Sequence, residues 1–161
     1  MPEGIKRVFF IVNPVSGVNH ARKSMLAEAV VSGFDPQQFE CVVRHSESAQ
    51  HVKELSSEAA RAGYDIIVAV GGDGTLNQAV KGMIGSDSVL AVVPAGSGNG
   101  LARHMNIPID IEQSLRLIVQ GKTQFIDTVN INDDLFVSIA GVGFDALVAK
   151  RFSQVTRRGF F

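Results

Sequence analysis

A strand-like apolar run that leads directly into a glycine-rich loop constrains this chain more than any other feature. The stretch reads VAVGGDGTLN, at residues 68–77, and its apolar start continues a run that begins at residue 66. An apolar run without polar alternation is typical of a strand that a parallel sheet buries on both faces. A turn needs one or two glycines, but three glycines surround Asp73 here. We therefore interpret this loop as a site for an anion or a metal ion at the end of a buried strand.

Strand-like and helix-like segments alternate along most of the chain. Apolar β-branched runs predict strands at residues 7–12, 39–44, 65–70 and 89–93. Amphipathic spacing and terminal glycines predict helices at residues 21–31, 49–62, 75–83, 99–105 and 110–119. Strands that alternate with helices through short connections favour an α/β fold, in which a parallel sheet carries helices on both faces.

The pattern changes after Gly121. Residues 125–131, a turn at residues 132–133 and residues 135–140 predict an antiparallel hairpin. We therefore expect an α/β domain at residues 1–123 and the first strands of a β-rich domain at residues 124–161. Because Phe160 and Phe161 need a surface on which to pack, we expect the chain to stop short of the rest of that second domain.

Composition excludes several classes of function. The formal net charge is −1, so no bulk charge favours nucleic acid as a partner. Cys41 is the only cysteine, which excludes an intrachain disulfide and fits a reducing compartment. No signal-peptide pattern is present, and no apolar run approaches the roughly 20 residues that a membrane span needs. We expect a cytoplasmic protein whose contact with a membrane, if any, is peripheral; a homodimer is left open.

Three glycine-rich loops follow predicted strands and precede predicted helices. They are NPVSG at residues 13–17, GGDGTLN at residues 71–77 and PAGSGNGLAR at residues 94–103. In parallel α/β sheets, ligands bind where strands hand over to helices, and free N–H groups at a helix start favour an anion. Taken alone, the first loop fits an ordinary turn and the third fits a flexible connection. Together, the three loops indicate a polyphosphate site at one edge of the sheet.

In this order and spacing, the three loops resemble the diacylglycerol kinase catalytic domain family, which includes bacterial lipid kinases, diacylglycerol kinases and sphingosine kinases. The resemblance continues through FIDTVNI and FVSIAGVGFDA, at residues 125–146, and so covers nearly the whole chain. GGDGT alone is shared with NAD kinases, whereas the other two loops are typical of the lipid kinases. The resemblance implies a two-domain kinase that binds ATP and Mg²⁺ between its domains and phosphorylates a diacylglycerol- or sphingoid-like lipid at the membrane surface.

The resemblance also implies roles for individual residues. The residues implied to bind the nucleotide are Asn13, Pro14, Ser16, Gly17, Ser46, Gly71, Gly72, Asp73, Gly74, Thr75, Leu76, Asn77 and Ser97. Ser46 and Ser97 stand where the family frequently has threonine, so a hydroxyl is kept at both positions. Asp73 and Asp127 are the implied catalytic and magnesium-binding carboxylates, and Asp145 is implied to lie near the lipid head group.

The sequence departs from the family pattern at the third loop. Gly100 follows Asn99, where many members have aspartate, so one carboxylate of the expected polar network is missing. The general base and the structural metal ligands of the family belong to the later β-rich domain, and we identify neither in this chain. We expect that the chain binds nucleotide weakly and does not catalyse phosphate transfer by itself.

Two other functions remain open, and so does the role of one basic cluster. An NAD kinase would share GGDGT and phosphorylate a ribose hydroxyl, and a non-catalytic nucleotide-binding module would fit Gly100. The basic cluster has aromatic neighbours, and it either contacts an anionic lipid surface or is a solvated face above packed phenylalanines. That cluster consists of Lys150, Arg151, Arg157 and Arg158, with Phe152, Phe160 and Phe161.

Overall fold

The structure is a computed structural model in which residues 5–14, 33–132, 134–137, 146–148 and 151 are described. The helix expected at residues 21–31 lies outside the described residues, as does the basic cluster apart from Arg151. Among the described residues, no helix combines the length and apolar character needed to cross a membrane.

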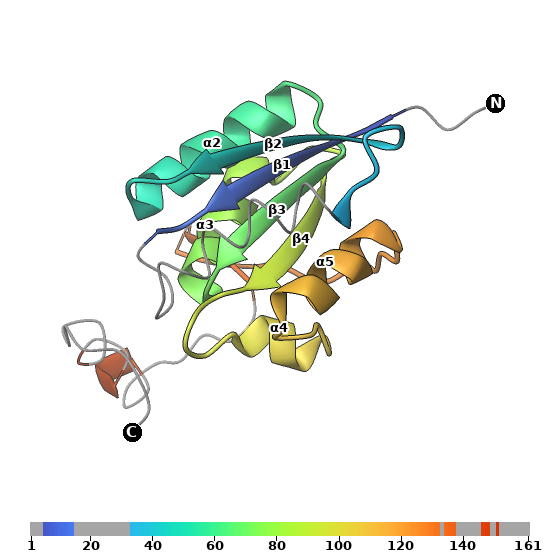
Figure 1. Ribbon diagram of the computed structural model, residues 1–161. Coiled ribbons are helices and arrows are strands. Elements are labelled where there is room, and N and C mark those ends of the chain that lie inside the picture. The colour runs from blue at the N-terminus through green and yellow to red at the C-terminus, as the bar shows by residue number, and fades with distance from the viewer. Residues whose placement is uncertain (1–4, 15–32, 133, 138–145, 149–150, 152–161) are drawn as a thin grey trace.

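A parallel sheet forms the centre of the molecule (Figure 1). Its four strands lie in the order β2-β1-β3-β4, and they are β1 (Lys6–Val12), β2 (Phe39–His45), β3 (Ile66–Gly71) and β4 (Val89–Pro94). The middle strands β1 and β3 are the most apolar, and Val8, Ile11, Ile67 and Val68 in them have no exposed surface. An unbroken apolar run therefore occupies a strand that is covered on both sides, as the sequence predicts.

Helices cover the two faces of the sheet with two separate apolar cores (Figure 1). On one face, α2 (Ala49–Arg61) and α3 (Asp73–Met83) pack against alternate strand residues such as Phe9 and Ile67. On the other face, α5 (Ile111–Val119) packs with the intervening residues, among them Phe10 and Val68. Side chains of a strand alternate between faces, which is why one strand serves both cores.

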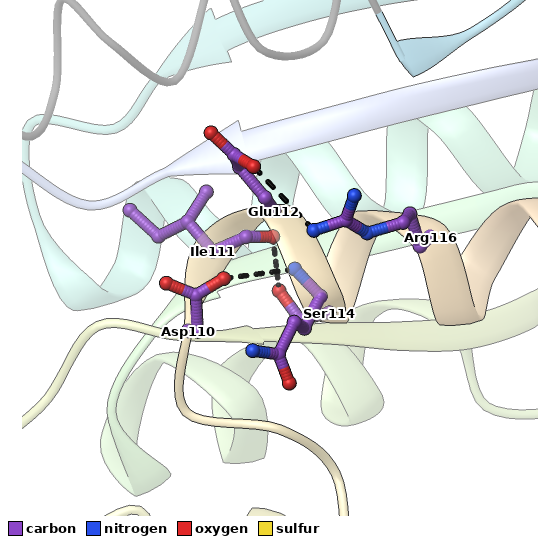
Figure 2. A network of polar contacts seen from close by, with 6 residues as sticks. Asp110, Ile111, Glu112, Ser114 and Arg116 are labelled. Atoms are coloured by element: carbon purple, nitrogen blue, oxygen red, sulfur yellow. Dashed lines mark hydrogen bonds and ion pairs between the residues drawn. The ribbon is translucent and has the colours of Figure 1, made fainter.

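Side chains cap the first turns of α2 and α5. Ser48 precedes α2, and its Oγ accepts a hydrogen bond from the backbone N–H of His51 at 3.0 Å. Asp110 precedes α5, and its carboxylate accepts from the N–H of Gln113 at 3.0 Å (Figure 2). Figure 2 also shows the ion pair of Glu112 with Arg116, 3.4 Å apart on the exposed side of α5. Capping of this kind satisfies N–H groups that have no partner within the helix.

The structure follows the predicted elements closely up to α5. The short helix α4 (Gly100–His104) follows β4, and most bounds lie within one or two residues of the predicted ones. Two bounds differ for a clear reason: α3 begins at Asp73 and β3 ends at Gly71, because Gly72 is the N-cap that separates the strand from the helix.

The hairpin is shorter than predicted. It consists of β5 (Val129–Ile131) and β6 (Asp134–Phe136), which pair antiparallel. The prediction of a strand from residue 125 is wrong, since residues 125–128 belong to no strand. Phe125 is 105% exposed, and among the described residues no strand pairs with it, so its strand propensity alone does not form a strand. Beyond Phe136, Val137 lies outside the strand, and residues 138–140 fall outside the described residues.

Candidate functional site

Three connections leave the sheet side by side at the carboxyl edge of β1, β3 and β4 (Figure 1). The N–H of Asn13 donates to the carbonyl of Val70 at 3.0 Å, and the N–H of Ala95 donates to the carbonyl of Gly71 at 2.9 Å. The strand pairing thus extends one residue into the first and third loops. Because of this extension, the starts of these loops have fixed positions beside the second loop.

A buried hydroxyl joins the first loop to the second. The side-chain amide of Asn13 donates to Oγ1 of Thr75 at 2.8 Å, and Thr75 is 5% exposed. A methyl group on Gly71 would lie 2.4 Å from that same Oγ1, so only glycine leaves room for Thr75 at this point. Gly71 and Asn13 therefore hold the first turn of α3 against the end of β1.

The second and third loops pack backbone against backbone. A methyl group on Gly96 would lie 2.4 Å from the Cα of Gly72, which is too close for any side chain. The side chain of Asn99 supports this contact, because its Oδ1 accepts from the N–H of Gly96 at 2.9 Å and its Nδ2 donates to the Gly96 carbonyl at 2.8 Å. Asn99 is itself left-handed, with φ of 52°, and buried.

Asp73, the first residue of α3, connects that helix to α4. Its Oδ2 accepts from the N–H of Gly100 at 3.0 Å, and its Oδ1 accepts from the N–H of Leu101 at 3.2 Å. The N-cap residue of α4, Asn99, makes no side-chain capping bond, so the Asp73 carboxylate takes that role from another loop. A carboxylate at a helix N-terminus is stabilised by the helix dipole. An ionised carboxylate offers about four acceptor positions, so Asp73 keeps acceptor capacity toward solvent.

The start of α3 lacks the side-chain cap that α2 and α5 possess. Its N-cap is Gly72, which makes no side-chain hydrogen bond. The helical ladder begins only when Leu76 donates to the Gly72 carbonyl at 3.1 Å. The N–H groups of Asp73, Gly74 and Thr75 therefore precede the ladder, which is the arrangement that binds phosphate at helix starts.

The other predicted nucleotide residues differ in their accessibility. Ser46 is 2% exposed, and its N–H donates to the Val12 carbonyl at 2.9 Å, so it lies at the same edge beneath the surface. Pro14 is half-buried and Ser97 is exposed. Leu76 faces the core of the α3 side of the sheet. Ser16, Gly17 and Asp145 lie outside the described residues.

Asn77 and Asp127 are predicted residues whose side chains make no hydrogen bond or ion pair to the other two loops in the described part of the chain. Asn77 is half-buried one turn into α3, and its Oδ1 accepts from the N–H of Val137 at 3.2 Å. Asp127 is exposed in the segment between α5 and β5. In the described part of the chain, no three His, Cys, Asp or Glu residues gather as a metal site.

Arg103 is the last residue of the third loop motif, but the sequence analysis predicts no function for it. Its Nε donates to the carbonyl of Gly98 at 3.0 Å, and a methyl group on Gly98 would lie 3.4 Å from Oδ2 of Asp73. The guanidinium is therefore held close to the loop that carries the Asp73 contacts. An arginine in the last turn of a short helix after a glycine loop is a signal that could have indicated it.

A shallow hollow on the outer side of α2, lined by Gln50, Lys53, Ser57 and Arg61 among others, contains none of these loop residues. The described residues of the three loops instead lie at the carboxyl edge of the sheet.

The family assignment now has independent support. A family model of the diacylglycerol kinase catalytic domain matches residues 7–131, which is most of the chain. The chain belongs to the diacylglycerol kinase catalytic domain family. The resemblance carried by the three loops is thereby confirmed.

Relatives within the diacylglycerol kinase family share moderate identity with this chain. A diacylglycerol kinase of Bacillus subtilis (strain 168) is 34% identical over 142 residues, which cover 86% of this chain and 46% of that protein. A diacylglycerol kinase of Mycobacterium tuberculosis (strain H37Rv) is 30% identical over 157 residues, which cover 94% of this chain and 50% of that protein. The chain thus spans about half the length of the curated relatives it matches.

Solved structures show the same fold. A crystal structure of a diacylglycerol kinase from Bacillus anthracis strain Sterne superposes with a TM-score of 0.72 at 23% identity, covering 91% of this chain and 53% of that one. The predicted α/β fold class, with a parallel sheet and helices on both faces, is therefore confirmed.

Proposed function

We propose that this chain supplies the nucleotide-binding part of an enzyme that transfers phosphate from ATP to the hydroxyl group of a lipid, with diacylglycerol or a sphingoid base as the acceptor class. Membership of the diacylglycerol kinase family and the names of its relatives support this choice. In this proposal, residues 1–123 bind the nucleotide and residues 124–161 begin the unit that faces the lipid.

The observation that carries the proposal is a glycine that the fold itself does not require. A methyl group on Gly74 would meet no atom within 4 Å beyond its own turn of α3, and Gly74 does not have a positive φ. Alanine is favoured over glycine in helices by about 1 kcal/mol. A glycine at this exposed position, beside uncapped N–H groups, is explained by a ligand that approaches the backbone closely.

The chemistry of the loops fits a nucleotide phosphate accompanied by a divalent cation. The N–H groups at the start of α3 favour an anion, but the Asp73 carboxylate beside them would repel it. A cation between the two resolves this conflict, and Mg²⁺ characteristically takes one or two carboxylates together with phosphate oxygens and water. When bound, it would neutralise charge on the transferred group. In this proposal Asp73 holds the ion, with Asp127 as the second carboxylate.

The residues of the chain would act mainly by positioning, which is the principal requirement of phosphoryl transfer. The Gly72–Gly96 contact and the Asn99 bonds fix the second and third loops against each other. Asn13, Pro14, Ser16, Gly17, Ser46 and Ser97 would complete the nucleotide contacts, and Asp145 would lie toward the lipid. Arg103 adds a cation near the same loops.

A glycine-to-alanine change tests the nucleotide site without disturbing the fold. In Gly74→Ala, we expect the free energy of unfolding in urea to stay unchanged or to rise by up to about 1 kcal/mol. The affinity for MgATP, measured by calorimetry, should fall about tenfold or more, because the added methyl group blocks the approach of phosphate (tenfold is about 1.4 kcal/mol). The matched control is Gly33→Ala, which also has open space around it and lies outside the three loops. Unchanged MgATP affinity in Gly74→Ala would contradict the proposed site.

The acceptor is tested in a hybrid protein in which this chain replaces the matching half of the Bacillus subtilis relative. We expect the hybrid, once shown to unfold cooperatively, to transfer labelled phosphate from ATP to diacylglycerol or to a sphingoid base in mixed micelles. NAD serves as the competing acceptor. Label on NAD and on neither lipid would replace the lipid kinase proposal with an NAD kinase.

A further inference from the structure

Two side chains on one face of α3 hold the hairpin that follows α5. Asn77 and Lys81 are four residues apart, so they lie one above the other on the helix surface. Oδ1 of Asn77 accepts from the N–H of Val137 at 3.2 Å. Nζ of Lys81 forms an ion pair with Oδ1 of Asp134, and the Lys81 side chain is 15% exposed. The two contacts bracket β6, one at its first residue and one just after its last.

The packing around β6 agrees with these contacts. Val137 is 7% exposed and belongs to the core that α2 and α3 share, and Leu135 packs partly against the same core. In contrast, Val129 and Ile131 of β5 are 45% and 49% exposed. Two strands of three residues each do not form a stable unit by themselves. The position of the hairpin is therefore set by α3, through β6.

The same helix begins at the candidate phosphate site. Asn77 lies four residues after Asp73, which corresponds to a rise of about 6 Å along the helix. A helix of three turns is rigid on this scale, so a residue that fixes the hairpin to α3 also fixes the hairpin relative to the second loop. The N–H of Val137 comes immediately after β6, and Asn77 supplies the acceptor that this N–H needs.

We propose that Asn77 is a positioning residue, not a nucleotide ligand. Together with Lys81 it holds β6 against α3, and it thereby fixes the position of Val137 relative to the second loop, where we place the phosphate. The consequence for phosphate transfer rests on the proposed function, whereas the attachment of β6 to α3 by Asn77 and Lys81 does not. Asn77 would then govern the alignment of whatever follows Val137 with the bound phosphate. It would leave the affinity for the nucleotide unchanged.

Hydrogen exchange tests this attachment directly in the 161-residue chain. In Asn77→Ala, we expect the amide of Val137 to exchange about tenfold faster or more, measured relative to the amide of Ile67 in the central sheet, which corrects for any global loss of stability. Asn77→Asp is the matched control, because a carboxylate still accepts from the Val137 N–H, and its exchange should remain near that of the parent chain. Lys81→Met, which removes the second contact, should also accelerate exchange at Val137.

The affinity for MgATP separates the two roles of Asn77. We expect the dissociation constant of Asn77→Ala to lie within about twofold of the parent value. A loss of affinity beyond that, or an unchanged Val137 exchange ratio in both Asn77→Ala and Lys81→Met, would overturn the proposal. If the parent chain binds no MgATP, the proposed nucleotide site fails, while the exchange measurement still decides whether the attachment exists.

Discussion

At the scale of single residues, the Asp73 carboxylate has a proposed role in binding and an observed role in the structure. Its carboxylate is proposed to hold a cation at the phosphate site, and it also accepts from the backbone N–H groups of Gly100 and Leu101. These N–H groups open α4 and have no capping side chain of their own. A change at Asp73 therefore alters the third loop as well as the charge of the site.

Removal of the Asp73 carboxylate should lower stability even without any ligand. Hydrogen bonds to a charged acceptor contribute about 1.5–3 kcal/mol, but Asp73 is exposed, so solvent reduces this contribution. We expect Asp73→Ala to lower the free energy of unfolding in urea by about 1 kcal/mol. Asp73→Asn should cost a similar amount, because the amide keeps one acceptor and turns an N–H toward a backbone N–H.

Asp127→Asn provides the control for that measurement. Asp127 is also exposed, and the described residues give it no hydrogen bond or ion pair, so its unfolding midpoint should match that of the parent chain. An identical midpoint for Asp73→Ala and the parent would show that the contacts to Gly100 and Leu101 contribute nothing. If they do contribute, a loss of activity in Asp73 variants cannot be assigned to metal binding alone.

This double role also shows what sequence reasoning can reach at a site. Asp73 was identifiable because its glycine neighbours and the preceding strand are adjacent in sequence. Its partners Gly100 and Leu101 are 27 and 28 residues away, and no local pattern links them. The same holds for the contact of Gly72 with Gly96, where each glycine alone fits an ordinary turn.

At the scale of elements, α2 and α3 approach each other closely at Gly82. A methyl group on Gly82 would lie 2.3 Å from the carbonyl oxygen of Lys53 and 2.8 Å from Cβ of Ser56. Ser56 is fully buried there, and its Oγ donates to the Ala79 carbonyl at 2.7 Å. The two helices thus need a residue without a side chain at this point, and a buried hydrogen bond joins them beside it.

Gly82→Ala should destabilise the protein although it improves helix propensity. The propensity gain is about 1 kcal/mol, but the added methyl group meets backbone atoms of α2 that can move only if the helices separate. Overpacking of this kind costs about 1–3 kcal/mol or more, so we expect a net loss of roughly 1–2 kcal/mol. Thermal or urea unfolding of the variant measures it. Gly74→Ala, the same change in the same helix with open space around it, should show no loss, and equal stability of the two variants would refute the steric argument.

The hairpin marks the limit of element prediction from this sequence. Phe125 and Ile126 have high strand propensity, yet they are exposed, and no strand among the described residues pairs with them. For β5, propensity and pairing agree only from Val129, where Phe136 is the partner. The strands of the parallel sheet were easier to predict, since burial on both faces leaves a continuous apolar run.

At the scale of the whole molecule, the two cores and the candidate site occupy different parts of the sheet. Both cores lie on its faces, whereas the three loops leave from one edge. Substitutions at exposed loop positions should therefore affect ligand binding more than stability, apart from the glycines and Asp73, which join the loops to each other. The strand β2 is one of the two outer strands of the described parallel sheet.

Cys41, the only cysteine, reports on the surroundings of that strand. It lies in β2 opposite Val8, and its half-buried side chain packs against the core on the α5 side of the sheet. Burial raises the pKa of the Cys41 thiol from 9.0 to about 11, because the thiolate is disfavoured away from water. The folded chain should therefore react slowly with an alkylating reagent at pH 9, while the chain in urea reacts quickly.

The same shift predicts how global stability depends on pH. Because the folded pKa of about 11 lies above the unfolded value of 9.0, the unfolded chain loses its Cys41 proton first as the pH rises. The unfolded state then binds fewer protons than the folded state, so the free energy of unfolding falls between these two pH values; below pH 9 this contribution is constant. Cys41→Ala lacks the thiol and should lose less stability over that interval. Urea unfolding of both proteins at pH 8, 9, 10 and 11 measures the difference. Parallel curves would mean that the thiol is as well solvated in the folded chain as in the unfolded one.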